Sequence, residues 1–124
     1  MIPLIRRGNL FAVEAQALGD VEQGMLLLAL DTGATRTVFD FNVAKRLKLQ
    51  PSKRRSRMVG IDGPVGMPTA SIDRLVVDHR SIDNMEVAFT DLPIEFLCDG
   101  LLGLDFLGSG TATFDFDRAT LALA

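Results

Sequence analysis

Short apolar or alternating runs, separated by glycine-containing turns, occupy most of the chain. Apolar and polar side chains alternate over residues 11–17, which predicts a half-buried strand. Residues 24–30 are continuously apolar and predict a strand that is buried on both faces. Similar short runs predict further strands at residues 37–39, 71–77, 85–89, 111–116 and 121–123. This pattern is typical of a mostly β domain built from hairpins.

Helical segments are expected to be few and short. Asp40 or Asn42 can cap a helix that runs through Leu47, with basic side chains near its C-terminal end. A single helical turn is expected near residue 106. The glycine-rich residues 58–67 predict a hairpin.

Length and charge narrow the classes of function. A chain of 124 residues has the size of one domain, so we expect a single domain over residues 1–124, in which residues 1–10 can be a flexible extension. The net charge is −3, and Trp and Tyr are absent, so no nucleic-acid partner is expected, and the basic run at residues 53–57 is interpreted as a solvated loop. No apolar run is long enough for a membrane span or a signal peptide, so no membrane partner is expected and the expected compartment is the cytoplasm.

Residues suited to metal binding or nucleophilic catalysis are scarce. A single cysteine, Cys98, excludes an internal disulfide and a zinc site built on cysteine pairs. A single histidine, His79, leaves little for a Ser-His-Asp triad. We expect Cys98 to be a small buried apolar residue and His79 to lie exposed in a turn. Neither a metal nor a cofactor is expected.

The most informative feature is an aspartate that directly follows an apolar strand, in the sequence Leu30-Asp31-Thr32-Gly33-Ala34. A carboxylate is costly to bury unless it is paired or hydrogen-bonded. Thr32 can supply a hydroxyl group, and Gly33 allows another backbone to approach closely. On these residues alone, an aspartate that caps a turn is the simpler interpretation.

Two later segments change that balance. A glycine-rich hairpin lies at residues 59–66, and an apolar-apolar-Gly sequence followed by a short helical turn lies at residues 101–107. Together with the Asp-Thr-Gly sequence and the following Thr37-Val38-Phe39, in this order, they resemble the retroviral-type (retropepsin-like) aspartic proteases, in particular their single-domain bacterial relatives. The resemblance covers most of the chain from Phe11 onward. It implies a mostly β, retropepsin-like fold: a closed, barrel-like sheet with one or two short helices.

Two positions depart from the retroviral pattern. Retroviral members have an acidic residue two places after the glycine of the Asp-Thr-Gly sequence and an arginine after the glycine of the third segment, and the two form an ion pair. Here these positions are Thr35 and Leu104. Both partners are absent together, so no buried charge is left unpaired. A substrate preference like that of the retroviral members is therefore not expected.

The chemistry of this family needs two adjacent aspartates, and Asp-Thr-Gly occurs once in this chain. The resemblance therefore implies a homodimer in which Asp31 of each copy meets on a two-fold axis. Two such carboxylates share one proton, so one can activate a water molecule while the other donates to the scissile carbonyl. Asp31 is the implied catalytic residue of an aspartic endopeptidase, with Thr32 and Gly33 as active-site support.

The resemblance also implies a peptide or protein substrate and the positions that contact it. Residues after the catalytic aspartate would follow the substrate backbone, others would line side-chain pockets, and flap residues would close over the substrate. These positions are Ala34 and Thr35 beside the backbone, Val38 and Leu101 in the pockets, and Gly60, Ile61 and Gly63 on the flap. Periodicity alone favours plain core for Val38 and Leu101, and Asp62 is interpreted as a turn residue.

Two other interpretations remain open. One is a catalytically silent, retropepsin-like module for dimerisation or peptide binding, and the other is a small β domain that assembles with a larger partner. Residues 112–123 are the expected dimer interface, although a hairpin that completes its own sheet would show the same pattern. Asp105 is expected to hydrogen-bond to the backbone near the active-site loop and to be structural.

Overall fold

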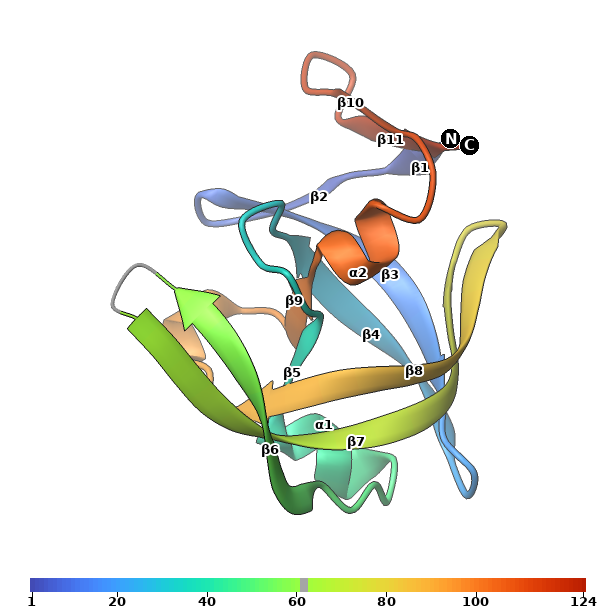
Figure 1. Cartoon of the computed structure of the whole chain (residues 1–124). Coiled ribbons are helices and arrows are strands. Elements are labelled where there is room, and N and C mark those ends of the chain that lie inside the picture. The colour runs from blue at the N-terminus through green and yellow to red at the C-terminus, as the bar shows by residue number, and fades with distance from the viewer. Residues whose placement is uncertain (61–62) are drawn as a thin grey trace.

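Strands make up most of the structure, as the alternating pattern predicts. The computed structural model describes residues 1–60 and 63–124, with the backbone alone for residues 53–60 and 63–65. The elements in chain order (Figure 1) are β1 (Ile2–Pro3), β2 (Ile5–Arg7), β3 (Leu10–Leu18), β4 (Gln23–Leu30), β5 (Val38–Asp40), α1 (Phe41–Arg46), β6 (Ser52–Gly60), β7 (Gly63–Val77), β8 (Arg80–Thr90), a 3-10 turn η1 (Ile94–Phe96), β9 (Gly100–Leu102), α2 (Leu104–Leu107), β10 (Ala112–Asp115) and β11 (Thr120–Leu123).

The larger sheet closes on itself. Its strand order is β2-β3-β4-β9-β5-β8-β7-β6, and an additional antiparallel pairing of β3 with β7 completes a ring (Figure 1). Most neighbours are antiparallel, but β4 pairs with β9 and β5 with β8 in parallel. The predicted fold class, a mostly β domain with a closed sheet and one or two short helices, is confirmed, and the sheet closes as a ring.

The two ends of the chain meet in a second, smaller sheet. Its order is β1-β11-β10, so the first strand of the chain lies beside the last, and we call these three strands the terminal sheet. It lies above the ring in Figure 1, and Leu121 and Leu123 of β11 belong to the same buried apolar cluster as the side chains of the ring. Residues 1–10, for which the sequence allows a flexible extension, contain β1 and β2, and β2 pairs with β3.

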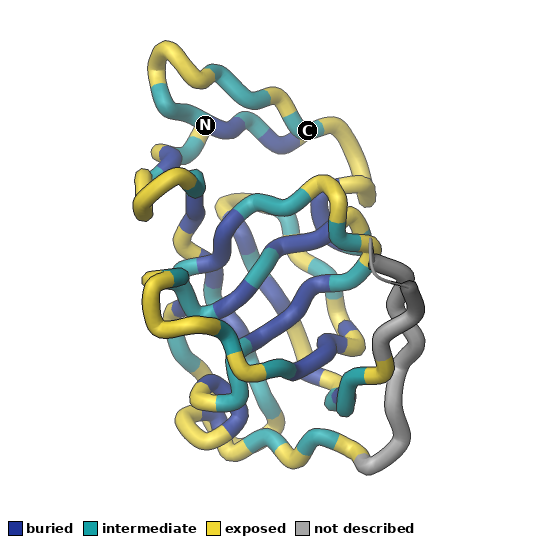
Figure 2. The backbone as a smooth tube through the Cα atoms, turned by 90° about the vertical axis from the view of Figure 1, so that its left-hand side faces the viewer, coloured by how far each residue is buried: buried dark blue, intermediate teal, exposed yellow. Residues whose placement is uncertain are grey.

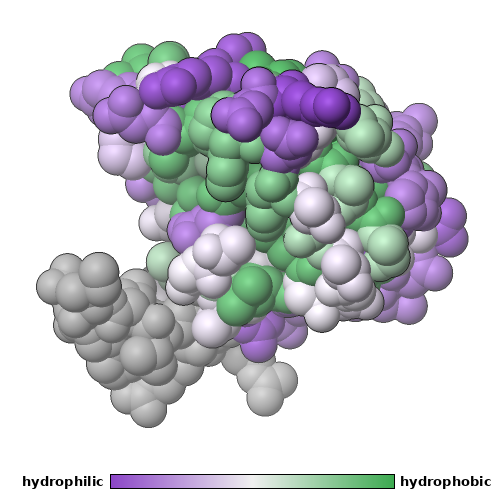
Figure 3. All heavy atoms as spheres, turned by 90° about the horizontal axis from the view of Figure 1, so that it is seen from above, coloured by the Kyte–Doolittle hydropathy of each residue, from purple (hydrophilic) through white to green (hydrophobic). Residues whose placement is uncertain are grey.

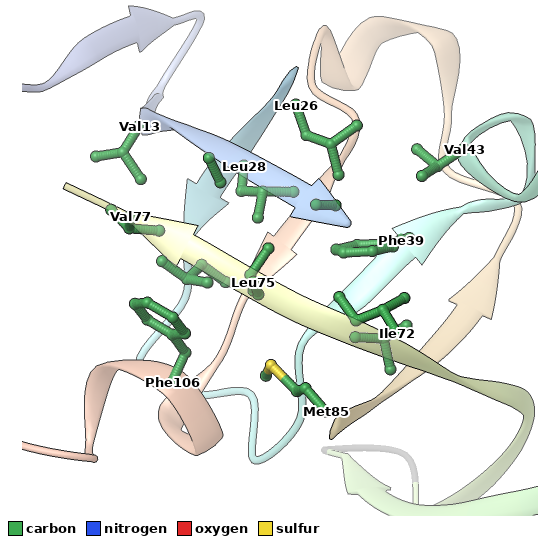
Figure 4. Packing of buried hydrophobic residues seen from close by; sticks show 14 of the residues in the cluster. Val13, Leu26, Leu28, Phe39, Val43, Ile72, Leu75, Val77, Met85 and Phe106 are labelled. Atoms are coloured by element: carbon green, nitrogen blue, oxygen red, sulfur yellow. The ribbon is translucent and has the colours of Figure 1, made fainter. Parts of the chain in front are cut away.

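Apolar side chains from all around the ring fill its interior. In β3, Val13 and Ala15 are buried while Glu14 between them is exposed, and the same alternation recurs along the ring (Figure 2). Figure 4 shows side chains from β3, β4, β5, β7, β8 and both α-helices pointing toward one another. Each fully buried Leu, Val or Phe stabilises the fold by about 1.5–3 kcal/mol relative to an exposed one.

Two details differ from the sequence predictions. The prediction that residues 24–30 are buried on both faces is wrong, because Met25 is 58% exposed whereas Leu26 and Leu28 are almost completely buried. A strand of a closed ring turns only one face to the interior, so its other face can meet solvent. The expected hairpin and the expected strand at residues 71–77 are joined, because β7 runs without a break from one into the other.

The predicted first helix is confirmed, with Asp40 as its cap. The Asp40 carboxylate accepts a hydrogen bond from the backbone N–H of Asn42, and Lys45 and Arg46 lie in the last turn. The other Asp40 oxygen accepts from the N–H of Leu92, so the same side chain links α1 to the segment after β8. In the part of the chain that is described, no helix has the length and apolar character needed to traverse a bilayer.

Candidate active site

Asp31 lies at the end of β4, where this strand runs beside β9. Its backbone N–H donates to the carbonyl of Leu102 at 3.0 Å, which extends the pairing of the two strands by one residue. Its side-chain Oδ1 accepts from the N–H of Gly33 at 3.0 Å, and its carbonyl accepts from the N–H of Ala34 at 3.2 Å. These bonds form a tight turn that fixes the partly buried carboxylate at the edge of the ring.

Thr37 ties the loop that carries this aspartate to α2. We call residues 31–37 the Asp31 loop. The Thr37 side chain is completely buried, and its hydroxyl donates to Oδ1 of Asp105 at 2.8 Å and accepts from the N–H of Gly103 at 3.1 Å. The backbone N–H of Thr37 donates to Oδ2 of Asp105 at 2.9 Å. Hydrogen bonds to an ionised carboxylate are roughly twice as strong as neutral ones, so this contact holds the loop firmly.

The expected hydrogen bond of Asp105 to the backbone near the loop is confirmed. Its partner Thr37 was missed by sequence reasoning, because the two residues are 68 positions apart and no local pattern joins them. The sequence signal at Thr37 was its place at the start of the strand predicted for residues 37–39.

Gly103 allows the Asp31 loop to pass directly against the start of α2. A Cβ atom at this position would lie 2.6 Å from the carbonyl oxygen of Arg36 and 2.9 Å from that of Ala34. Such distances are too short for any real side chain, so only glycine permits this approach. Just beyond it, the N–H of Leu104 donates to the carbonyl of Ala34 at 2.8 Å.

The positions expected to contact substrate differ in how accessible they are. Thr35 is exposed and Ala34 is partly exposed. Val38 and Leu101 face each other across β5 and β9, but Val38 is only 2% exposed whereas Leu101 is partly exposed, so Leu101 presents more surface in the single chain. Their contact with substrate remains a prediction.

The glycine-rich hairpin is formed by β6 and β7. Gly60 and Gly63 are paired at the ends of these strands. Ile61 and Asp62 lie outside the described residues, so the expectations for them stay predictions. The hairpin reaches out from the ring on the side of the Asp31 loop (Figure 1).

The two positions at which the retroviral ion pair is absent are both open to solvent. Thr35 is exposed and Leu104 is 44% exposed. Arg36 of the Asp31 loop forms an ion pair with Glu86 of β8, with 2.8 Å between Nη1 and Oε1. Sequence reasoning missed this pair. Both side chains are substantially exposed, so this pair adds only about 0–1 kcal/mol.

An apolar cavity of about 330 Å³ opens beside Thr32. Aromatic rings dominate it, because Phe116 lies 5.5 Å from the ring of Phe11 and 6.0 Å from that of Phe114. Phe116 is 63% exposed, which is unusual for so large an apolar side chain. The residues that line this cavity are Asn9, Leu10, Phe11, Leu30, Thr32, Phe114 and Phe116. The face of the molecule that carries the terminal sheet exposes apolar side chains over its middle, between hydrophilic edges (Figure 3).

Cys98 and His79 do not join the Asp31 loop through any described contact. Cys98 is only partly buried, but burial raises the pKa of its thiol, which disfavours the reactive thiolate. His79 lies exposed in the turn between β7 and β8, as expected, and its Nδ1 is 3.0 Å from a carboxylate oxygen of Asp78.

Comparison with known proteins agrees with the observed fold. The family described as "Aspartyl protease" matches residues 13–106, which is more than half of the chain. No curated protein sequence matches significantly. A retropepsin-like aspartic protease from Rickettsia conorii has a similar structure, with a TM-score of 0.63 and 17% identity over 93% of this chain and 82% of that one. The EIAV protease in complex with the inhibitor HBY-793 has a TM-score of 0.56 and 24% identity over 84% of this chain and 90% of that one.

Proposed function

Because the chain belongs to the aspartyl protease family, we propose that it is an aspartic endopeptidase whose active site forms from Asp31 of two copies of the chain. The observation that carries this proposal is the geometry of the Asp31 loop. A carboxylate is held at the edge of the ring by backbone bonds and remains accessible enough to meet a second one. The resemblance in sequence and the similarity in fold both support this assignment.

The proposed reaction needs one ionised and one protonated carboxyl group. Two aspartates at a two-fold axis share a proton, because two negative charges within hydrogen-bond distance repel each other. The ionised Asp31 accepts a proton from a water molecule, which attacks the carbonyl carbon of the scissile peptide bond. The protonated Asp31 of the other copy donates to the carbonyl oxygen as the tetrahedral intermediate forms. As this intermediate collapses and the C–N bond breaks, the Asp31 that took the water proton transfers it to the leaving nitrogen, and a hydroxyl group of the intermediate returns a proton to the other Asp31.

The single chain supplies only half of this site, and its surface supports a second copy as the partner. Each chain contains one Asp-Thr-Gly sequence. The aromatic cavity beside Thr32 exposes apolar surface next to the Asp31 loop, and Thr32 itself is exposed. In an isologous dimer the same surface of both copies is covered at once. Thr32 would then brace the two loops against each other, and residues 112–123 would form part of the interface.

The substrate is proposed to be an extended peptide that lies along the Asp31 loop. Exposed Thr35 and partly exposed Ala34 offer backbone groups beside the carboxylate, and Leu101 offers an apolar side chain for a pocket. Val38 lies opposite Leu101 on the neighbouring strand and would line the same pocket. Gly60, Ile61 and Gly63 of the β6–β7 hairpin are proposed to cover the peptide and exclude water.

Peptide cleavage tests the proposal. Purified wild type, Asp31→Asn and the control Asp20→Asn, which alters an exposed aspartate in the turn between β3 and β4, are incubated with a diverse peptide mixture from acid to neutral pH. Products are identified by mass spectrometry, and circular dichroism verifies that each variant is folded. We expect cleavage by the wild type and the control, and a loss of about a thousandfold or more in Asp31→Asn.

Two results would contradict the proposal. Undiminished cleavage by folded Asp31→Asn would remove Asp31 from the chemistry. A stable wild-type dimer that cleaves no peptide at any pH, yet binds peptides, would favour the catalytically silent binding module instead.

A further inference from the structure

Arg80 connects three parts of the molecule that are distant in sequence. It is the first residue of β8 and follows the two-residue turn Asp78-His79, in which Asp78 has a positive φ of 55°. This tight turn directs the Arg80 side chain out of the β7–β8 hairpin, toward α2 and the terminal sheet. The side chain is partly buried there.

The guanidinium group of Arg80 donates four hydrogen bonds to backbone carbonyls. Nη1 donates to the carbonyls of Phe106 and Leu107, at 3.2 and 3.1 Å, at the C-terminal end of α2. Nη2 donates to the carbonyls of Thr111 and Ala124, at 2.8 and 2.9 Å, which flank β10 and β11. Arginine is the side chain that can do this, because its planar fork carries several donors in fixed directions.

The carbonyls that Arg80 binds belong to two structural units. Thr111 and Ala124 pair with each other through N–H···O bonds of 3.0 and 2.9 Å, and they close the open end of the β10–β11 hairpin. The opposite end of α2 carries Asp105, which binds Thr37 of the Asp31 loop. The Arg80 side chain therefore joins the β10–β11 hairpin to α2, the helix that holds the Asp31 loop.

The backbone of Gly110 packs closely against the Arg80 guanidinium group and the Ala124 carbonyl. A Cβ atom on Gly110 would lie 2.7 Å from Nη2 of Arg80 and 2.5 Å from the carbonyl oxygen of Ala124. The chain therefore approaches the guanidinium group at a position where only glycine leaves room for it. A substitution at Gly110 should displace the same two bonds without altering Arg80.

We propose that Arg80 is a positioning residue that holds the β10–β11 hairpin in a fixed position relative to α2 and the Asp31 loop. This inference rests on the proposed function, because the two surfaces that Arg80 joins are those that a second copy would contact together. A partner that must meet both the Asp31 loop and residues 112–123 binds well only when these are held in the correct relative position. Arg80 supplies this pre-organisation without contact with the substrate.

The first test compares Arg80→Met, Arg80→Lys and the control Arg74→Met. Arg74 lies on the same β7–β8 hairpin, where it is exposed and pairs with Asp83. The specific cleavage activity of each folded variant is measured against protein concentration. Arg80→Met should shift the concentration at half-maximal activity upward by about tenfold or more, with kcat at saturating concentration changed by less than about twofold. Arg80→Lys should recover part of the shift, and Arg74→Met should match the wild type.

A merely structural role would lower the melting temperature and leave this concentration dependence unchanged, and that result would overturn the proposal. The proposal would equally fail if Arg74→Met produced the same shift as Arg80→Met.

A second measurement separates this inference from the proposed function. Hydrogen exchange of the Thr111 and Ala124 amides is compared in wild type, Arg80→Met and Gly110→Ala. Both variants should exchange these amides at least about tenfold faster, while the β7–β8 amides stay protected. If the wild type cleaves nothing but exchange changes in this way, the proposed activity fails and the positioning contact stands. If exchange at Thr111 and Ala124 is unchanged, Arg80 does not hold the hairpin.

Discussion

Inside the ring of strands, Phe39, Phe89 and Leu28 are fully buried among other apolar side chains. A few residues away, the Asp31 loop is held by polar contacts: the bonds of Thr37 with Asp105 and the turn around the aspartate itself. Apolar packing is non-directional and is shared among many contacts, whereas a hydrogen bond fixes one direction and is lost entirely when one partner is removed. The ring therefore supplies stability, and the polar loop supplies the geometry that the proposed chemistry needs.

The largest expected effect is on stability and comes from the ring. Phe89→Ala removes a phenyl group that is completely buried and whose centre lies 6.0 Å from that of the Phe39 side chain. It should lower the free energy of unfolding by about 3–5 kcal/mol, because it removes buried area and leaves a cavity. Urea unfolding measures this loss. Peptide cleavage per folded molecule should change little. A large fall in that rate would contradict the claim that the ring of strands supplies stability whereas the Asp31 loop supplies the geometry.

The next effect concerns the close approach at Gly103. Gly103→Ala would force the backbone of the Asp31 loop away from α2, since the added Cβ would lie 2.6 Å from the Arg36 carbonyl. We expect cleavage activity to fall by about a hundredfold, because moving the loop backbone by about 1 Å would misalign the Asp31 carboxylate. Gly24→Ala is the control, because its Cβ would meet only the flexible end of the Leu47 side chain, at 3.1 Å. Equal loss in both variants would contradict this account.

Thr37→Val should have a smaller effect, on stability and geometry together. Valine keeps the shape of the buried side chain but leaves Oδ1 of Asp105 and the N–H of Gly103 without the hydroxyl. The free energy of unfolding should fall by about 2 kcal/mol, the typical cost of an unsatisfied buried polar group. Thr37→Ser keeps the hydroxyl and should recover most of this loss in thermal unfolding. If serine and valine behave alike, the hydroxyl does not hold the loop.

The smallest expected effect is electrostatic and lies outside both regions. The hydrogen bond from His79 lowers the pKa of Asp78, so the folded chain binds this proton less readily than the unfolded chain does. The contribution of Asp78 to stability is therefore present above the ordinary aspartate pKa of about 3.9 and is lost as the pH falls through its lowered pKa. Asp78→Asn should lower Tm slightly at neutral pH and leave it unchanged at about pH 2. Asp20→Asn, the control, should not change this profile.

The apolar region was largely predictable from the sequence. Alternation along β3 and the apolar run of β4 identify these strands within one or two residues, and Asp40 indicates where α1 begins. Met25 was misjudged, because a run of apolar letters does not tell which face of a strand meets solvent. The closure of the ring by β3 and β7 also depends on distant residues that no local pattern joins.

The polar region was predictable only in part. Asp31 became the candidate through the resemblance of its Asp-Thr-Gly sequence and two later segments to the aspartic proteases, because an aspartate after an apolar strand by itself favours a turn cap. Thr37 and Arg80 were missed because their partners are far away in sequence, and because Arg80 binds backbone carbonyls, which every residue type provides. Contacts of this kind become visible only when the fold brings the elements together.

The central claim is that Asp31 of two copies forms one active site, and subunit mixing tests it most directly. Wild type and Asp31→Asn are mixed in varying ratio at constant total concentration, held until the subunits have exchanged, and assayed for peptide cleavage. Only wild-type pairs would carry two aspartates, so activity should follow the square of the wild-type fraction and fall to roughly one quarter in an equal mixture. Activity that falls linearly with the wild-type fraction would contradict the account, because each chain would then act alone.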